Sequence, residues 1–206
     1  MKKTLLIVLA VVVVAVLFVI GKYNTIVKYD ESVKTAWSQV ENVYQRRLDL
    51  IPNLVNTVKG AAAQESGVLI AVVNARANAT KTTVDIKDAK SLAEYQKVQG
   101  EVSSSLSKLL VVVESYPALQ SIQAFRDLMT QLEGTENRIT VERKNFNDAV
   151  NTLNVYVRKF PANIVATLFG FEKAQQFEAK EGADVTPTVD FGTTPPADTI
   201  PTEGTE

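Results

Sequence analysis

Residues 117–160, PALQSIQAFRDLMTQLEGTENRITVERKNFNDAVNTLNVYVRKF, decide the fold. Their apolar residues recur at alternating intervals of three and four, the spacing that places side chains on one face of an α-helix. Glu136 and Arg143 occupy two positions where this rhythm calls for a buried apolar side chain. A helix of this length needs long partners to cover its apolar face, so we expect other segments of the chain to form long helices as well.

Composition bounds the chemistry that this chain can perform. Its 206 residues are 46% hydrophobic and 22% charged, which suits one globular domain with appendages. The chain has no cysteine and no histidine, which excludes disulfides, thiolate nucleophiles, histidine bases and most transition-metal sites. The net charge is −1 and the basic residues are interspersed with acidic ones. Carboxylate, lysine or tyrosine chemistry stays open, but no such site is assembled in the sequence pattern. We therefore expect a non-enzymatic protein with no cofactor, no metal and no nucleic-acid partner.

Residues 1–21 are predicted to be a transmembrane anchor. Positions 5–20 are all apolar, and with their two neighbours they form a helix of about 27 Å, close to the thickness of a bilayer core. A cleaved signal peptide is the alternative, but this run ends in Phe18-Val19-Ile20 and not in small residues. Lys2 and Lys3 favour a cytoplasmic amino terminus, so we expect a single-pass protein in the cell membrane with its soluble part outside the cytoplasm.

The following segments have helical periodicity. A helix is predicted from residue 22 to about 65, with Pro52 bending it and Asn53 or Asn56 reaching the carbonyl that Pro52 frees. A second spans about 64–80, and after a polar loop a third runs to Ser115, begun by a capping box of Ser91 and Glu94. The fourth is the helix over 117–160.

Four helices joined by short connections predict an all-α fold, an antiparallel up-and-down four-helix bundle over residues 22–178. An apolar run, residues 164–171, follows at the foot of the bundle, where it packs beneath the helices or lies in the headgroup region of the membrane. Residues 179–206 are rich in proline, threonine and acidic residues. We expect them to form a disordered tail, because they cannot bury enough apolar surface to offset the entropy of ordering.

The polar residues that interrupt the helical stripes fall at one height. In the up-and-down topology Arg47, Gln99 and Glu136 lie in a common layer, which predicts a buried network around the guanidinium. By the same count, Arg143 lies level with Glu41, so these two are expected to form a second buried pair. The layer is interpreted as a device that fixes helix register, as single polar core positions do in coiled coils.

The motifs of the chain resemble those of the LemA family of bacterial membrane proteins. The longest are AWSQV at 36–40 and RRLDLIPNLV at 46–55, followed by ESYP at 114–117 and TENRI at 135–139. Leu48 stands where the family usually has an aromatic residue, and Gln64 where it often has a histidine. The resemblance implies an amino-terminal membrane segment and a helical bundle, and it implies no activity. The motif positions singled out are Trp37, Arg46, Asp49, Pro52, Asn53, Asn137 and Arg138.

Three functions follow from these features. The first is a non-catalytic, membrane-tethered scaffold or adaptor that binds another envelope protein. The second is a sensor or receptor that holds a small anion between helices at Arg46, Arg47 or Arg138. The third is a hydrolase that uses Asp49 and Glu136, and it has little support because these carboxylates lie on different helix faces. Self-association through the bundle or the anchor stays open.

Overall fold

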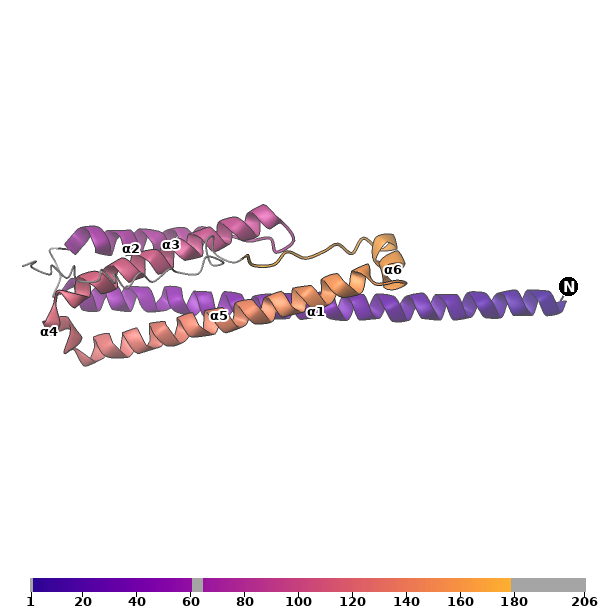
Figure 1. Ribbon diagram of the computed structural model, residues 1–206, viewed down its shortest axis with the longest axis horizontal. Coiled ribbons are helices and arrows are strands. Elements are labelled where there is room, and N and C mark those ends of the chain that lie inside the picture. The colour runs from indigo at the N-terminus through magenta and orange to yellow at the C-terminus, as the bar shows by residue number, and fades with distance from the viewer. Residues whose placement is uncertain (1, 61–64, 179–206) are drawn as a thin grey trace, which may run out of the picture.

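The computed structural model describes residues 2–60 and 65–178, and its regular structure is helical throughout these ranges (Figure 1). The all-α prediction is confirmed. Four long helices are accompanied by two short ones, and the predicted tail lies outside the described residues. The elements in chain order are α1 (Lys2–Lys59), α2 (Ser66–Lys81), α3 (Ala89–Glu114), α4 (Pro117–Gln120), α5 (Gln123–Arg158) and α6 (Ala162–Leu168).

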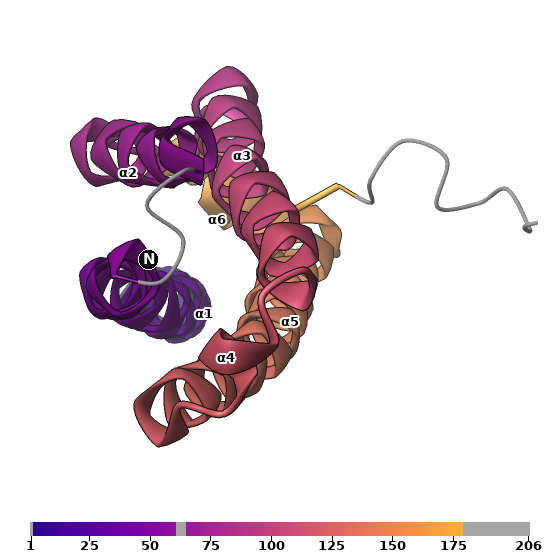
Figure 2. The ribbon, with the colours of Figure 1, turned by 90° about the vertical axis from the view of Figure 1, so that its left-hand side faces the viewer.

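The helix α1 forms the axis of the molecule. It runs the whole length of the structure, and α2, α3 and α5 lie beside its carboxyl-terminal part in alternating directions (Figures 1 and 2). The residues of α1 from Ile26 to Val58 that recur at helical spacing are buried. Among residues 5–20, only Val19 is partly buried against the core. Every other large apolar side chain in this run is at least 48% exposed. By length and composition, with a mean hydropathy of 3.3, this part of α1 is able to cross a membrane.

Helix α1 continues through Pro52 without a break. Proline has no N–H, so the carbonyl of Leu48 loses its partner within the helix. Arg76 of α2 takes that place: its Nε–H donates to the Leu48 oxygen at 2.8 Å. The expectation that Asn53 or Asn56 would reach this carbonyl was wrong. The proline therefore creates an attachment point between two helices.

Aromatic side chains form the centre of the half of the core that lies nearer to the apolar run of α1. The Trp37 ring contacts Tyr95 at 5.5 Å, Phe146 at 5.3 Å and Phe177 at 5.8 Å between ring centroids. Phe146 in turn contacts Phe177 at 5.5 Å. Such edge-to-face and offset pairs add to the stabilisation that area burial gives. Helices α1, α3 and α5 are thus joined at one level by a single cluster.

Two predicted helix starts differ from the structure. The cap of α3 is Asp88, whose carboxylate accepts from the N–H groups of Lys90 and Ser91, so the predicted capping box at Ser91 is wrong. The predicted helix over 117–160 is divided into α4 and α5. Pro117 begins α4, as expected from its fixed φ. The Leu119 side chain of α4 is fully buried (0% exposed), and the chain turns after α4 before α5 begins. Periodicity alone does not reveal a turn whose residues keep the apolar spacing.

An extended segment, residues 171–178, packs along α5 and is called the strap. Asn154 exchanges two hydrogen bonds with the backbone of Ala174, at 2.9 and 3.0 Å. Asn147 does the same with Phe177, at 3.1 and 2.9 Å. Seven helical residues span about 10.5 Å and three extended residues about 10 Å, so the two repeats match. This asparagine ladder holds Phe177 in the aromatic cluster.

The ladder predicts a pair of destabilising substitutions. Asn147→Ala or Asn154→Ala leaves a partly buried backbone N–H and C=O of the strap unpaired, which should lower the free energy of unfolding by about 1–3 kcal/mol. Urea denaturation followed by circular dichroism measures the change. Asn151→Ala is the matched control, because Asn151 lies exposed on the same helix between the two ladder positions. An effect of Asn151→Ala equal to the other two would contradict the ladder.

Candidate functional site

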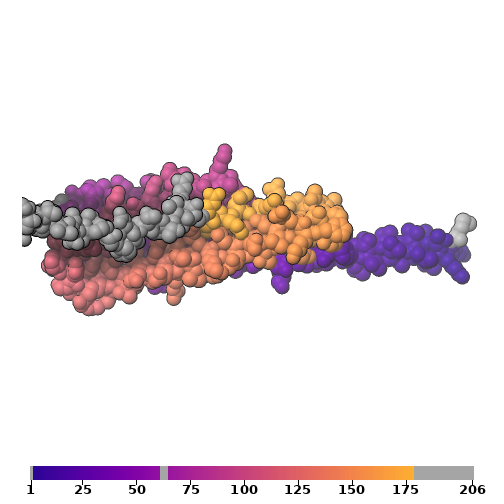
Figure 3. Space-filling view, in the orientation of Figure 1, coloured from indigo at the N-terminus to yellow at the C-terminus, as the bar shows by residue number. Residues whose placement is uncertain are grey.

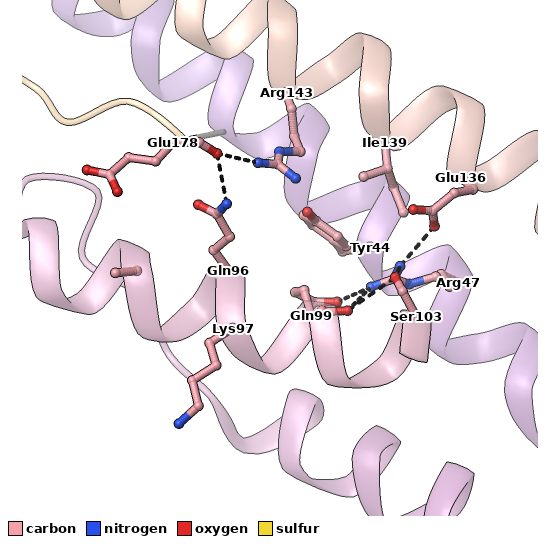
Figure 4. A pocket seen from close by; sticks show the side chains of 12 residues that line it. Tyr44, Arg47, Gln96, Lys97, Gln99, Ser103, Glu136, Ile139, Arg143 and Glu178 are labelled. Carbon is pink, nitrogen blue, oxygen red and sulfur yellow. Dashed lines mark hydrogen bonds and ion pairs between the residues drawn. The ribbon is translucent and has the colours of Figure 1, made fainter. Parts of the chain in front are cut away.

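A cleft of about 530 Å³ opens between α1, α3 and α5, with the end of the strap at its edge (Figure 4). Its lining is mixed, with charged, amide and aromatic side chains contributed by all three helices. Figure 4 shows the guanidinium of Arg47 at one end of the cleft and that of Arg143 at the other, with Tyr44 between them. Lys97 also borders the cleft but points away from both.

The hydrogen-bond acceptors of Arg47, which belongs to α1, lie on two other helices, α3 and α5. Its Nη1 donates to Glu136 Oε2 of α5 at 2.9 Å and to Ser103 Oγ of α3 at 2.7 Å. Its Nη2 donates to Oε1 of Gln99 at 2.6 Å and to the backbone oxygen of that residue at 3.1 Å. The structure therefore brings Arg47, Gln99 and Glu136 together at one level. Ser103, one turn after Gln99, was not predicted, because serine is common on exposed helix faces.

Burial differs among the members of this group. Arg47 is 2% and Gln99 3% exposed, whereas the Glu136 side chain is 54% exposed. The expectation of a dry layer that encloses the carboxylate is thus wrong. Glu136 lies at the mouth of the cleft because α5 and α3 do not close over it, and it reaches inward with one oxygen. Screening by water weakens the ion pair, so the buried amide of Gln99 and the half-buried hydroxyl of Ser103 carry much of the stabilisation of Arg47.

The predicted pair of Glu41 and Arg143 is absent from the ion pairs of the described residues. Glu41 is exposed on α1. Arg143 turns instead to the strap, where it stacks over the ring of Phe177 at 4.5 Å and donates to the backbone oxygen of Glu178 at 3.3 Å. Gln96 of α3 donates to the same oxygen at 2.9 Å. The sequence count placed Arg143 at the right helix face but could not include the strap that covers it.

Two tyrosines lie next to the Arg47 group. The Tyr44 ring is 5.1 Å from the Arg47 guanidinium and 5.5 Å from the Tyr95 ring. Burial raises the pKa of both phenols, most strongly that of Tyr95, because the phenolate would be poorly solvated there. Tyr44 and Gln99 also line a second cleft, of about 450 Å³, on the side facing residues 79–84. The side chains of Tyr44 and Gln99 thus lie between the two clefts.

The remaining motif positions divide by burial. Trp37 is buried in the aromatic cluster, and Pro52 is half-buried at the junction with α2. Asp49 accepts from Gln45 on its own helix at 2.8 Å and does not meet Glu136. The other motif positions do not join the Arg47 group, and all of them lie on the surface together with Asp49: Arg46, Asn53, Asn137 and Arg138.

The chemistry of this site is that of a structural junction. No cluster of three or more acidic groups able to hold a metal ion occurs within residues 2–60 and 65–178. Arg47 presents four of its five donors to groups of the chain, and its Nε–H has no partner there. The arrangement links α1 to α3 and α5 through the hydrogen bonds of one guanidinium. Its role in setting register stays a prediction.

Residues 36–191 match the LemA family. The chain belongs to this family. The match begins within α1, after the apolar run, and extends past residue 178 into the segment predicted to be a tail. Two curated relatives are magnetosome protein MamQ 2 and magnetosome protein MamQ 1 of Paramagnetospirillum magneticum. Each is 28% identical over 201 residues, which cover 85% of this chain and 74% of the relative.

A third relative is magnetosome protein MamQ of Magnetospirillum gryphiswaldense. It is 26% identical to this chain over 190 residues, which cover 82% of this chain and 70% of the relative. In all three pairs the similarity covers most of both chains. In this chain, α3, α5 and the strap lie within the family match, and α1 lies across its beginning.

The unequal burial of the Arg47 group predicts unequal effects of substitution. Arg47→Ala removes a buried side chain and strands Gln99, so it should cost about 3–5 kcal/mol of unfolding free energy. Glu136→Ala leaves Arg47 its other partners and admits water, so it should cost about 1–2 kcal/mol. Urea titration measures both. Glu133→Ala, at an exposed position on the same helix, is the control, and an Arg47→Ala effect as small as that of this control would contradict the assignment.

The buried phenols predict alkaline instability. Because the folded state holds the phenol protons of Tyr44 and Tyr95 more tightly than the unfolded chain does, raising the pH above about 10 favours unfolding. Each phenol contributes up to about 1.4 kcal/mol per pH unit. Tyr95→Phe should therefore flatten the decline of the urea midpoint between pH 10 and 12, with no change of slope below pH 9. Parallel curves for the two proteins across this range would oppose the prediction.

Proposed function

We propose that this protein is a membrane-anchored, non-catalytic scaffold that binds another envelope protein. Residues 5–20 cross the cell membrane once, and the antiparallel bundle of α1, α2, α3 and α5 stands outside the cytoplasm. Lys2 and Lys3 before the apolar run support this orientation. The proposal assigns no cofactor, no metal and no nucleic acid to the chain.

The observation that carries the proposal is the continuity of α1. One helix contains both the exposed apolar run and the buried stripe of the bundle. Residues 22–59 of α1 extend about 57 Å beyond the apolar run at about 1.5 Å per residue. The strap, the Pro52 junction and the Arg47 group fasten the other helices to this axis. The construction suits a rigid post that holds a binding surface at a fixed distance from the bilayer.

The binding surface that we propose lies on the outer face of α1. Arg46, Asp49 and Asn53 follow one another at intervals of three and four on that face and are exposed, so they do not contribute to the core. They belong to the longest motif through which the chain resembles its family. Exposed charged and amide side chains within a motif are better explained by an external partner than by folding. Asp49 contacts only Gln45 of its own helix face.

The names of the relatives support a structural role. The name of the relatives, magnetosome protein MamQ, refers to a cellular structure and does not name a reaction. The carboxylates considered for hydrolysis, Asp49 and Glu136, are engaged separately with Gln45 and Arg47. Within the described ranges this leaves no assembled acid and base pair.

A receptor for a small anion is the second candidate. It is favoured by the cleft between Arg47 and Arg143 and by the unpartnered Nε–H of Arg47. The carboxylate of Glu136 and the carbonyl of Glu178 already occupy the inward faces of these two arginines. An anion would have to displace groups of the protein itself, so we rank the scaffold first.

Site-specific photo-crosslinking tests the scaffold. A photoreactive residue in place of Arg46 or Asn53 should capture one defined membrane or envelope protein in intact cells. The same residue at Lys108, which is exposed on α3, should not. The charge reversal Arg46→Glu should abolish capture from position 53 and leave the thermal midpoint within about 1 °C, since exposed residues contribute little stability.

Three results would count against the scaffold. Equal capture from position 108 would mean that the outer face of α1 has no special role. Capture of a second copy of the chain alone would indicate self-association. Capture of nothing, together with saturable thermal stabilisation by inorganic phosphate that Arg143→Ala removes, would favour the receptor.

A further inference from the structure

The short helix α6 is apolar on both of its faces. Ala162, Val165 and Ala166 are buried against the bundle, each 3% exposed. On the opposite side, Ile164 and Leu168 lie one turn apart and are 58% and 72% exposed. Large apolar side chains on a helix normally face a cover, although α6 also exposes the polar residues Asn163 and Thr167. The outer side of α6 has no cover within the described chain.

Neighbouring residues extend this exposed apolar surface. Phe160, just before α6, is 80% exposed, and Phe169, just after it, is 50% exposed. We call these two with Ile164 and Leu168 the foot patch. Four large apolar side chains within ten residues form a concentration that a water-facing surface rarely carries without a binding role.

The position of α6 along α1 indicates what covers the foot patch. Tyr23, which follows the apolar run of α1 by three residues, contacts Phe169 at 4.9 Å and Phe171 at 5.6 Å between ring centroids. Figure 1 shows α6 turned across the direction of α1, and Figure 3 shows this region as the end of the bundle from which α1 emerges. If residues 5–20 cross a bilayer, the foot patch is at the level of its headgroups.

The charges around α6 fit the same location. Arg158 and Lys159 precede the foot patch and Lys173 follows it, and all three are exposed. Lys22 lies over the Phe18 ring at 5.3 Å, at the end of the apolar run. None of these four forms an ion pair with a described residue. Basic side chains beside an apolar surface are typical of elements that lie in the interface of an anionic membrane.

We propose that α6 is a second membrane contact, with the foot patch inserted shallowly into the same leaflet from which α1 emerges. The proposal rests on the membrane anchoring stated under the proposed function. The apolar side chains of the foot patch leave water and contact the upper part of the acyl chains, and the flanking basic side chains contact lipid phosphates. Two contacts set side by side would fix the tilt and the rotation of the bundle on the membrane, which one crossing helix alone leaves free.

Spin-label depth measurements on the full-length protein test this. The chain has no cysteine, so single substitutions Leu168→Cys, Val14→Cys and Val111→Cys can each carry a nitroxide without further changes. Val111 is the matched control, because it is an apolar residue on α3 with 65% exposure, close to the 72% of Leu168. Vesicles of phosphatidylcholine and phosphatidylglycerol at three to one supply the membrane, and circular dichroism confirms that each labelled variant is folded.

The readout is the ratio of accessibility to oxygen, which concentrates in lipid, over accessibility to a water-soluble nickel chelate. We expect the ratio at position 168 to be at least threefold that at 111 and below that at 14. A position-168 ratio equal to that at 111, with position 14 in the bilayer, overturns the second contact and leaves the anchor intact. A label at 168 shielded from both reagents indicates protein cover and also overturns it. A water-exposed label at position 14 overturns the anchor itself.

Discussion

Burial of a guanidinium group requires acceptors on every side of it, and in this protein the acceptors of Arg47 come from α3 and α5. Gln99, Ser103 and Glu136 must arrive at the height of Arg47 for its charge to be tolerated in a core position. An apolar stripe alone permits helices to slide by a turn with modest loss of contact. We expect the directional bonds of Arg47 to restrict that freedom, and the aromatic cluster around Trp37 packs the same three helices about three turns away along α1.

The same principle recurs at two other places, each time with a polar side chain bound to a backbone group. Arg76 satisfies the carbonyl that Pro52 exposes, and the asparagine ladder satisfies the strap. In each case an unpaired backbone group would be costly, and its partner comes from a different element of the fold. Helix α2 and the strap are thereby attached at defined points.

The sequence allowed the long helices to be placed because each carries an apolar stripe of many turns. It also allowed Arg47, Gln99 and Glu136 to be set at one height, since helix rise is constant. The strap could not be predicted, because its pairing with Asn147 and Asn154 depends on amide groups whose spacing has no hydrophobic signal. Because the strap was not predicted, Arg143 was expected to pair with Glu41, whereas it contacts the strap. The exposure of Glu136 depends on how far apart α3 and α5 lie, which periodicity does not report.

The uninterrupted course of α1 has a mechanical consequence. A helix resists twisting and stretching far more than a loop does, so α1 offers a direct mechanical connection between residues 5–20 and Arg47, more than twenty-five residues away. Lipid thickness, or torque from a neighbouring helix in the bilayer, would then be felt as strain in the polar group and the openings beside it. The continuous helix α1 can therefore transmit motion as well as hold the bundle in place.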